Sequence, residues 1–371
     1  MANIAVDIRS LQVNQLTGVG IYTREAVLAL LKNDHKNKYR LFYSGFKPIN
    51  LDFLKALDEF SNFSLIRIPW PNKILNLCLW IFNFPKFDLF VKADLFWFPN
   101  FNFWSLSKKT PYILTVHDLA FIRYPQFYSK KMRFWHKALW PKAKLRKAQK
   151  IIAVSENTKK DIVELAGIAP EKIEVIYSGV EIMPAKEASL IKEKYGLPDK
   201  FLLYLGTIEP RKNIISIISA FEKLINNDYS LIIAGGRGWL YKKIEKRIST
   251  STKKDKIKLI NYIAPEDQPI IYSLAKSLLW PSFYEGFGFP PLEAQQQNCN
   301  VITSANSSLP EVVKNSALLI DPYNTEELTQ CLAQLINNDK LKQNLNLKAE
   351  KNFKNYTWTN TAEKMIRLLT N

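Results

Sequence analysis

Two glutamates, Glu285 and Glu293, stand eight residues apart around a turn rich in glycine and proline. The apolar run 277–280 before the turn predicts a buried strand, and the residues from about Pro291 onward predict a helix. Carboxylates at such a turn can accept hydrogen bonds from sugar hydroxyls, and the N-terminus of the helix attracts phosphate. By spacing alone, a solvated loop glutamate followed by a first-turn glutamate explains the pattern equally well.

A second predicted strand-to-helix turn carries a basic pair. The predicted strand 201–205 is followed by Gly206, then by Arg211 and Lys212, and then by a predicted helix over 214–225. The planar guanidinium of arginine matches the oxygens of a phosphate, and lysine adds a compact positive charge. Basic residues are common on protein surfaces, so this turn by itself also fits a solvated loop.

The first half of the chain has candidate binding residues at predicted strand ends. His117 and Asp118 follow the buried strand 111–116, and Gly18 and Gly20 follow the first predicted strand and lead into a helix. The carboxyl ends of parallel strands face the ligand in an open α/β sheet. A lone histidine is more often structural, however. Asp118 could orient His117 or cap the next segment, and the glycines also fit a plain loop.

Together, the run Glu-Gly-Phe-Gly-Phe-Pro-Pro-Leu-Glu over 285–293, the basic loop and Val-His-Asp-Leu resemble motifs of the retaining glycosyltransferases of family 4. The resemblance implies an α/β fold of the GT-B type, with two Rossmann-like domains facing across a cleft. It covers nearly the whole chain and weakens between about residues 32 and 110. The expected parts are an acceptor-binding domain over 1–182, a nucleotide-sugar-binding domain over 183–355, a linker within 181–200, and a terminal helix over 356–371 that crosses back to the first domain.

For the donor, the resemblance implies that Glu293 binds the ribose of a nucleotide-sugar. It also implies that Glu285 and the amides of residues 287–289 face the sugar and the phosphate. The donor-binding residues expected in this way are Gly18, Gly20, Gly206, Arg211, Lys212, Tyr262, Ile263, Glu285, Gly286, Phe287, Gly288, Phe289, Leu292 and Glu293.

For the reaction, the resemblance implies four catalytic residues, namely His117, Arg211, Lys212 and Glu285. Arg211 and Lys212 would hold the pyrophosphate and stabilise the charge of the leaving group, and His117 would lie near the donor sugar. The implied chemistry is a front-face displacement with retention, in which the departing phosphate helps to deprotonate the acceptor. No Asp-x-Asp sequence occurs, so we expect no metal and no cofactor beyond the nucleotide-sugar.

The donor is less well defined than the reaction class. His-Asp-Leu at 117–119 and Val-Ser-Glu-Asn-Thr-Lys-Lys-Asp-Ile at 154–162 look most like mannosyltransferases of bacterial surface-polysaccharide assembly. The resemblance therefore favours GDP-mannose, with UDP-glucose, UDP-galactose and UDP-N-acetylglucosamine as alternatives. Asn261 stands where the family usually has glycine beside the base, which leaves the base open. The implied acceptor is a lipid-linked or lipopolysaccharide-like glycan.

The composition is that of a globular protein of two domains. The chain has 371 residues, of which 47% are hydrophobic. Its three cysteines have no paired spacing, which favours a reducing compartment and argues against a zinc site. The N-terminus does not resemble a signal peptide, and the apolar stretch 74–84 is too short to span a bilayer. We therefore expect a cytoplasmic protein.

The positive charge is concentrated in the first part of the chain. Residues 1–150 contain 24 Lys and Arg against 9 Asp and Glu, and residues 119–150 contain ten basic residues and no acidic residue. The stretch 126–148 predicts one long basic helix with aromatic residues, which is typical of a membrane-surface helix but also fits a solvated face. The aromatic residues of 70–104 fit either core packing or contact with a membrane interface. We expect an anionic membrane as the partner of 119–150, at the inner face of the cell membrane.

Two other classes of function fit parts of the sequence. The net charge of +18 would suit a nucleic-acid-binding protein, but no recognition motif for nucleic acid is present, so we expect no such partner. A catalytically silent scaffold docked on a membrane would need neither the acidic pair nor the basic pair. The presence of both pairs therefore favours the enzyme.

Overall fold

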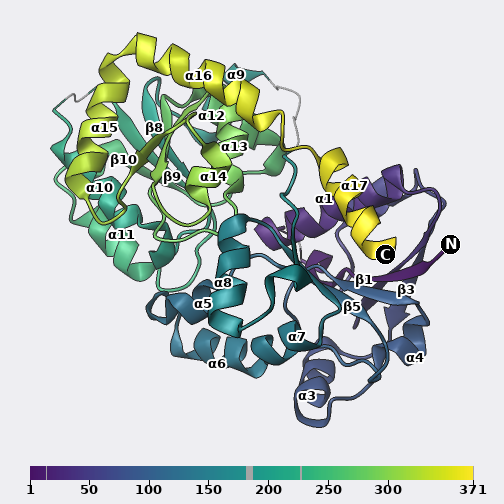
Figure 1. The fold of residues 1–371 in the computed structure, drawn as a ribbon. Helices are drawn as coiled ribbons and strands as arrows, with labels where there is room; N and C mark the ends of the chain where they lie inside the picture. The colour runs from purple at the N-terminus through teal and green to yellow at the C-terminus, as the bar shows by residue number, and fades with distance from the viewer. Residues whose placement is uncertain (14, 181–186, 226–227, 371) are drawn as a thin grey trace. The chain divides into compact units, whose positions relative to one another are not determined.

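The chain folds into two α/β units, each built around one parallel sheet (Figure 1). The computed structural model describes residues 1–13, 15–180, 187–225 and 228–370. The first unit comprises residues 1–123, 130–179 and 356–371, and the second comprises 124–129 and 180–355. Two Rossmann-like parallel sheets with helices confirm the predicted fold class.

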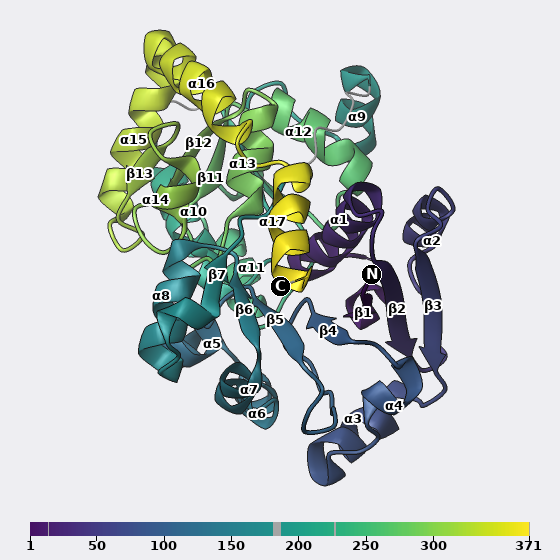
Figure 2. The same ribbon diagram turned by 45° about the vertical axis from the view of Figure 1, so that its right-hand side comes forward.

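The sheet of the first unit has seven parallel strands in the order β3-β2-β1-β4-β5-β6-β7, which Figure 2 shows side by side. Its central strands are apolar and fully buried, as expected for a parallel sheet that helices cover on both faces. The strands are β1 (Asn3–Asp7), β2 (Lys38–Ser44), β3 (Phe63–Ile68), β4 (Leu95–Phe98), β5 (Tyr112–Val116), β6 (Lys150–Ala153) and β7 (Ile173–Val175).

The last helix of the chain packs on the first. Helix α17 (Trp358–Thr370) lies beside α1 (Gly18–Asn33) in both ribbon views (Figures 1 and 2). The Thr361 hydroxyl donates to the carbonyl oxygen of Tyr177 at 2.8 Å, which ties α17 to the segment after β7. The other helices of this unit are α2 (Leu51–Leu57), α3 (Asn72–Phe82), α4 (Phe87–Val91), α5 (Ala120–Arg123), α6 (Lys130–Ala138), α7 (Pro141–Lys147) and α8 (Glu156–Ala166).

The single long helix predicted over 126–148 is wrong. The stretch forms a 3₁₀ turn, Pro125–Phe127, followed by α6 and α7. Trp140 takes a left-handed backbone conformation, with φ of 52°, just before Pro141. Proline has no backbone N–H to donate within a helix, and it disfavours helical backbone angles at the residue before it. The helix therefore ends before Pro141.

The two glycines that were expected in a loop before the first helix are instead part of that helix. Gly18 and Gly20 lie in the first turn of α1, which begins at Gly18. Thr17 precedes the helix in extended conformation, and its carbonyl oxygen accepts the first helical hydrogen bond, from the N–H of Ile21 at 2.8 Å. The side chain of Thr17 forms no capping hydrogen bond, so the start of the helix rests on this backbone contact.

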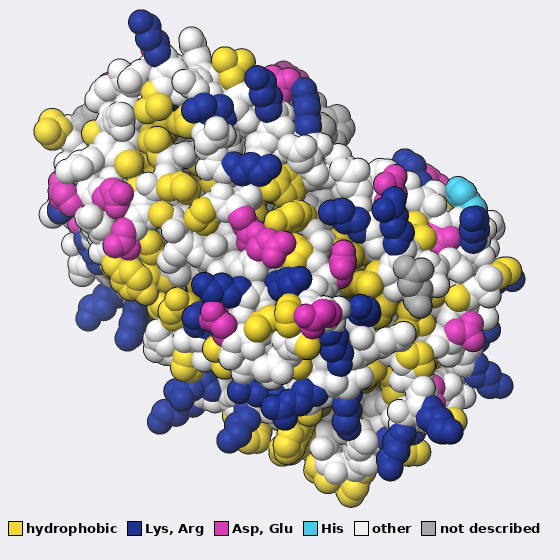
Figure 3. Space-filling view, in the orientation of Figure 1, with side chains coloured by type: hydrophobic (Ala, Val, Ile, Leu, Met, Phe, Trp, Pro, Cys, Tyr) yellow, Lys and Arg dark blue, Asp and Glu magenta, His cyan; other side chains and the backbone are white. Residues whose placement is uncertain are grey.

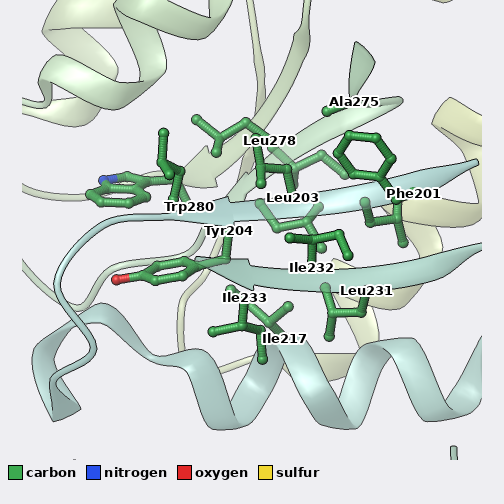
Figure 4. Packing of buried hydrophobic residues seen from close by; sticks show 14 of the residues in the cluster. Phe201, Leu203, Tyr204, Ile217, Leu231, Ile232, Ile233, Ala275, Leu278 and Trp280 are labelled. Atoms are coloured by element: carbon green, nitrogen blue, oxygen red, sulfur yellow. The ribbon is translucent and has the colours of Figure 1, made fainter. Parts of the chain in front are cut away.

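The sheet of the second unit has six parallel strands in the order β10-β9-β8-β11-β12-β13. They are β8 (Phe201–Leu205), β9 (Ser230–Ala234), β10 (Ile257–Ile260), β11 (Ser277–Trp280), β12 (Asn300–Ser304) and β13 (Leu318–Ile320). Figure 4 shows apolar side chains of β8, β9 and β11 packed with Ile217 of α10 (Ile214–Lys223). The remaining helices are α11 (Lys242–Ser249), α12 (Gln268–Leu274), α13 (Phe289–Gln296), α14 (Leu309–Val313), α15 (Thr325–Asn337) and α16 (Asp339–Phe353).

The predicted linker over 181–200 contains a helix. Residues 181–186 lie outside the described residues, and α9 (Ala188–Tyr195) follows them. Ile191 of α9 is buried in the core of the second unit, and Gly196 ends the helix in left-handed conformation. Over the described ranges, no helix combines the length and the apolar character needed to cross a bilayer.

Candidate donor site

The candidate site of the second unit lies where three neighbouring strands end. Strands β8, β11 and β12 are adjacent and parallel, so the loops that follow them leave the same edge of the sheet. The loop after β8 carries Arg211 and Lys212, and the loop after β11 carries Glu285. The N–H of Phe283 donates to the carbonyl oxygen of Arg211 at 2.9 Å, which joins the first two loops directly.

The structure brings the predicted basic pair and Glu285 into one ionic network. Glu285 pairs with Arg211 Nη1 at 2.8 Å and with Lys212 Nζ at 2.6 Å. Glu209, which the sequence analysis did not select, pairs with Arg211 Nη2 at 2.7 Å. Arg211 Nη1 also donates to the carbonyl oxygen of Tyr284 at 2.6 Å. Two carboxylates and a carbonyl therefore fix the guanidinium from different sides.

The network sets the protonation of its members. Burial alone would raise the pKa of Glu285, but the charges of Lys212 and Arg211 lower it to about 2. Burial raises the pKa of Glu209, and the charges of Arg211 and Lys212, which lower it, only partly offset this. Glu285 is therefore ionised at neutral pH, and it suits electrostatic stabilisation or hydrogen-bond acceptance better than proton donation.

An aromatic platform supports the basic loop. The rings of Tyr204 and Trp280 stack with centroids 5.3 Å apart, and Figure 4 shows them parallel where β8 and β11 end. Lys212 Nζ lies 4.4 Å from the centroid of the Trp280 ring. A cation held over an indole in this way is stabilised by the ring quadrupole. Lys212 is thus positioned by a carboxylate and an aromatic face together.

The acidic loop is held by two serines that follow β12. Ser307 Oγ accepts from the backbone N–H of Glu285 at 3.0 Å. Ser308 Oγ donates to the carbonyl oxygens of Glu285 at 3.0 Å and Phe287 at 2.6 Å, as alternative acceptors for one hydroxyl proton. Gly288 then takes φ of 117°, a conformation available mainly to glycine, and α13 begins at the next residue. These contacts fix the direction in which Glu285 and the start of α13 point.

The second predicted glutamate lies on α13. Glu293 Oε2 accepts a hydrogen bond from the hydroxyl of Tyr272, on α12, at 3.1 Å. Although the residue as a whole is partly exposed, desolvation raises the pKa of Glu293 to about 7, against the lowering effect of the Tyr272 hydrogen bond. With this pKa, the ionisation of Glu293 changes near neutral pH. Tyr272, which holds the carboxylate, is a second site residue that the sequence pattern did not indicate.

Apart from Gly18 and Gly20, the other predicted donor residues belong to the same unit. Gly206 follows β8, Gly286 and Phe287 lie in the acidic loop, and Phe289 and Leu292 lie in the first turn of α13. Because residues 290 and 291 are prolines, only Phe289 and Leu292 have an N–H among the first four residues of this helix.

Tyr262 and Ile263 follow the edge strand β10, which β9 separates from β8. Ile263 is buried in the apolar core, so its side chain is not placed to recognise a ligand. Tyr262 is 37% exposed and can present its ring. Of this predicted pair, Tyr262 is the better candidate for contact with a base.

A close approach between two loops gives a stability prediction. Gly235, after β9, has φ of 140°, and a Cβ there would lie 1.9 Å from the carbonyl oxygen of Gly206. We expect Gly235→Ala to lower the free energy of unfolding by roughly 3 kcal/mol or more. Gly236→Ala is the matched control, because its Cβ would meet nothing within 4 Å. Chemical denaturation of both variants tests this, and equal stabilities would contradict it.

His117 belongs to the first unit, at the end of β5. Its Nε2 donates to the carbonyl oxygen of Pro99 at 2.9 Å, so Nδ1 is the acceptor nitrogen of the neutral ring. Burial lowers the pKa of His117, against the effects of the Pro99 carbonyl and the charge of Asp118. Asp118 Oδ1 accepts from the N–H of Ala120 at 3.0 Å, so its carboxylate caps the following turn. At neutral pH, His117 is therefore an uncharged, oriented imidazole.

The predicted N-terminal glycines are connected to His117 through α1. Gly18 is exposed and Gly20 is buried. Tyr22, one half-turn further along α1, packs edge-on against the His117 ring with centroids 4.7 Å apart. Nothing in the sequence pattern distinguishes Tyr22 from an ordinary core residue of a helix. The structure thus places the glycine turn and His117 in one neighbourhood of the first unit.

A short segment from the first half of the sequence packs on the second unit. Phe127 stacks on Phe283 of the acidic loop, with centroids 5.2 Å apart and planes inclined by 14°. Tyr128 stacks on Trp239 in the same way, at 5.4 Å and 18°. Residues 124–129 thus buttress the loops after β9 and β11, although the helices on either side of them belong to the first unit.

Two family models match the chain and together cover most of it. The model of the family 4 glycosyltransferases, described as "Glycosyltransferase Family 4", matches residues 16–183. The model described as "Glycosyl transferases group 1" matches residues 187–352. The first therefore carries the glycine turn and His117, and the second carries the ionic network and Glu293.

Known proteins resemble the chain over nearly its full length. O-antigen chain mannosyltransferase B of Escherichia coli is 26% identical over 376 aligned positions, which cover 95% of each chain. Sucrose-phosphate synthase of Thermosynechococcus elongatus has the same fold, with a TM-score of 0.77 at 19% identity over 99% of this chain and 98% of that chain. HepE of Anabaena, solved in complex with UDP-glucose, gives a TM-score of 0.73 at 15% identity and covers both chains fully.

Proposed function

Because the chain belongs to glycosyltransferase family 4, we propose that it moves mannose from GDP-mannose to a hydroxyl group of a lipid-linked or lipopolysaccharide acceptor, with retention of configuration. The observation that carries this proposal is the network of Arg211, Lys212 and Glu285 at the carboxyl edge of the second sheet. It combines a fixed cationic pair, suited to a diphosphate, with an ionised carboxylate, suited to a sugar.

In this proposal the basic pair binds the leaving group. Arg211 is fixed by Glu209 and Glu285, so its N–H donors need no reorganisation when charge develops on the diphosphate. Lys212 uses one of its three N–H donors for Glu285 and can offer the others to phosphate oxygens. The N–H groups of Phe289 and Leu292 at the start of α13 add partial positive charge. We propose that these groups act without a bound metal ion.

The carboxylates take the sugar side of the donor. Glu293, in its ionised form, accepts hydrogen bonds from the ribose hydroxyls, and Glu285 accepts from hydroxyls of the transferred sugar. The C1–O bond to the diphosphate breaks as the acceptor oxygen bonds to C1 on the same face, and the departing phosphate oxygen takes the acceptor proton. We further propose that His117, neutral at neutral pH, acts as a hydrogen-bonding group for the sugar.

The donor assignment has separate support. A relative similar over 95% of both chains is named as an O-antigen mannosyltransferase, which favours mannose and a bacterial polysaccharide acceptor. HepE, which shares the fold, binds UDP-glucose in its solved complex, so a UDP-sugar remains the second candidate. Three free cysteines fit a reducing compartment, and we propose that the enzyme works in the cytoplasm at the inner face of the membrane.

A donor screen tests the proposal. The purified protein is incubated with GDP-mannose, UDP-glucose, UDP-galactose and UDP-N-acetylglucosamine, and thermal stability and slow donor hydrolysis are measured. At a donor concentration of about 100 Kd, we expect GDP-mannose to stabilise the protein by about 2.7 kcal/mol. The effect should vanish in Glu293→Ala and persist in Glu350→Ala, whose carboxylate is exposed on α16. Stabilisation by a UDP-sugar alone would reassign the donor, and no response to any donor or to free GDP and UDP would contradict the proposal.

A further inference from the structure

Helix α3 is apolar on two opposite faces. Leu75 and Leu79 are buried against the first unit, as a helix packed on a core requires. Ile74, Leu77 and Ile81 repeat at the same helical spacing on the other side and are each more than 50% exposed. A helix that is apolar all round is normally buried in protein or in lipid. The outer face of α3 therefore requires an explanation.

The exposed apolar face continues beyond α3. Phe82, 71% exposed, ends α3, and the exposed Leu89 and Phe90 lie on α4. Trp80 of α3 meets Phe134 of α6 edge-on, with ring centroids 5.9 Å apart. The surface formed by the outward side chains of α3, α4, α6 and the segment between α3 and α4 is called the apolar ridge below. Its exposed members are Ile74, Leu77, Trp80, Ile81, Phe82, Phe84, Leu89, Phe90, Phe134 and Trp135.

Basic residues accompany the apolar ridge, and acidic residues are nearly absent from its helices. Helices α3, α6 and α7 contain no Asp or Glu. The acid of α4, Asp88, is directed inward, since its Oδ1 accepts from the N–H of Ser107 at 2.9 Å. In Figure 3 yellow side chains gather over α3 at the lower edge of the molecule, and dark-blue side chains lie beside them. The exposed cations on these helices are Lys73, Lys130, Lys131, Arg133, Lys137, Lys142, Arg146 and Lys147.

These cations are available to an anionic partner. Over the described ranges of the chain, no carboxylate forms an ion pair with Lys73, Lys131, Arg133 or Lys137. Long basic side chains around inserted aromatic and aliphatic residues are the arrangement by which interfacial helices bind anionic bilayers. The charges would meet lipid phosphates while the apolar side chains enter the region of the acyl chains.

We propose that the apolar ridge docks the protein on an anionic phospholipid bilayer, with α3 as the element that inserts into the interface and α6 as the element that binds lipid phosphates. The proposal deepens the proposed function and rests on it for its purpose, because a lipid-linked acceptor is found at a bilayer surface. The sequence left two interpretations of the aromatic stretch 70–104, core packing and contact with a membrane interface. The basic stretch 119–150 provides charge, and the exposed side chains of α3 and α4 provide the main apolar anchor.

The charge of the ridge favours lipid over the two other occupants. A second copy of the chain would bring an identical set of cations against the first, and this like-charge contact opposes a symmetric interface. A nucleic acid would satisfy the cations, but it would leave the exposed aliphatic side chains of α3 in water. A bilayer of anionic lipids satisfies both parts of the ridge.

Vesicle co-sedimentation of the full chain tests the docking surface. We expect binding to phosphatidylcholine vesicles that contain phosphatidylglycerol, weak binding to pure phosphatidylcholine vesicles, and weakening of the first by salt. The double variant Leu77→Asp, Ile81→Asp should bind at least about tenfold more weakly, because two apolar side chains no longer leave water. The variant Lys131→Glu, Arg133→Glu should lose the preference for anionic lipid.

Controls separate the docking surface from folding and from the sugar chemistry. Leu347→Asp changes a side chain on α16 that is as exposed as those of α3, and it should bind vesicles as the wild type does. Cooperative thermal unfolding at the wild-type temperature, measured without ligand, shows that each variant is folded. Donor binding without vesicle binding would overturn the docking proposal alone, and vesicle binding without any donor binding would overturn the proposed function alone. Equal vesicle binding by the α3 variant and the wild type, or a dimer that the α3 variant abolishes, would also overturn the docking proposal.

Discussion

Replacing Arg211 with alanine is expected to lower the rate of sugar transfer at saturating donor by about 10²–10³-fold, the typical loss when one preorganised donor to a developing anion is removed. Arg211 contacts Glu209, Glu285 and the carbonyl oxygen of Tyr284, so its position is fixed before any substrate binds. Transfer is measured as release of GDP in the presence of an acceptor glycan. The rate of slow donor hydrolysis in the absence of acceptor is a second measure of how well each variant cleaves the donor.

Arg211→Ala is also expected to lose stability, so a second and more conservative variant is needed to separate a loss of catalysis from a loss of folding. Removing the guanidinium leaves Glu209 and Glu285 buried with one cation fewer, which typically costs about 3–5 kcal/mol. Arg211→Lys keeps the charge but loses the fork that reaches two carboxylates at once, and we expect it to fold and to transfer slowly. If Arg211→Lys is folded and transfers sugar at the wild-type rate, the guanidinium has no role in catalysis.

The affinity for the donor is expected to increase as the pH rises through about 7, and to fall roughly tenfold per pH unit below it. Desolvation raises the pKa of Glu293 to about 7, and the proposed contact with ribose uses the ionised carboxylate as a hydrogen-bond acceptor. Isothermal titration measures the affinity for the donor at pH values between about 5.5 and 8.5. This range extends about 1.5 pH units on either side of the pKa. In Glu293→Gln the affinity should be weak and independent of pH over this range.

Protein stability should change with pH in the opposite direction. The folded-state pKa of Glu293 lies above the unfolded value of about 4.5, so the folded protein binds more protons between these values. This contribution is fully present below about pH 4.5 and is lost as the pH rises through about 7. Its size is at most about 3 kcal/mol, and it is reduced by the partial exposure of the residue.

Tyr272 provides the matched control for both effects. Its hydroxyl donates to Glu293 and thereby favours the ionised carboxylate. We expect Tyr272→Phe to shift the midpoint of donor binding to higher pH without abolishing the dependence. A pH profile that is the same in the wild type, Tyr272→Phe and Glu293→Gln would show that another group controls the affinity.

Local sequence signals predicted much of the architecture. Apolar runs such as 277–280 became buried strands because a parallel sheet covered by helices excludes water from both faces of each strand. Ser155 caps α8 through a hydrogen bond from the N–H of Thr158, and Gly167 ends that helix in left-handed conformation. Signals of this kind depend on residues within a few positions of one another, so they can be read without a tertiary structure.

Predictions from the sequence were wrong where the composition of a stretch fits more than one local structure. The basic stretch 126–148 has a helical composition, but Pro141 divides it and Trp140 turns the chain between α6 and α7. The charged stretch 181–200 suggests a linker, yet α9 forms there, and Ile191 and Leu197 are buried in the core of the second unit. Their burial depends on a surface made by residues remote in sequence.

Periodicity and short motifs were sufficient to predict the class of the fold, the strand-to-helix turns and the residue types that suit a nucleotide-sugar. Which of these groups meet could be seen only in the folded chain. Glu209 fixes Arg211, Tyr272 holds Glu293, and Trp280 lies under Lys212. The apolar side chains of α3 likewise proved to be exposed on one face and buried on the other. The physical reason is that ion pairs, pKa shifts and exposure depend on distance and desolvation in space, and those are set by packing between strands and helices far apart in the chain.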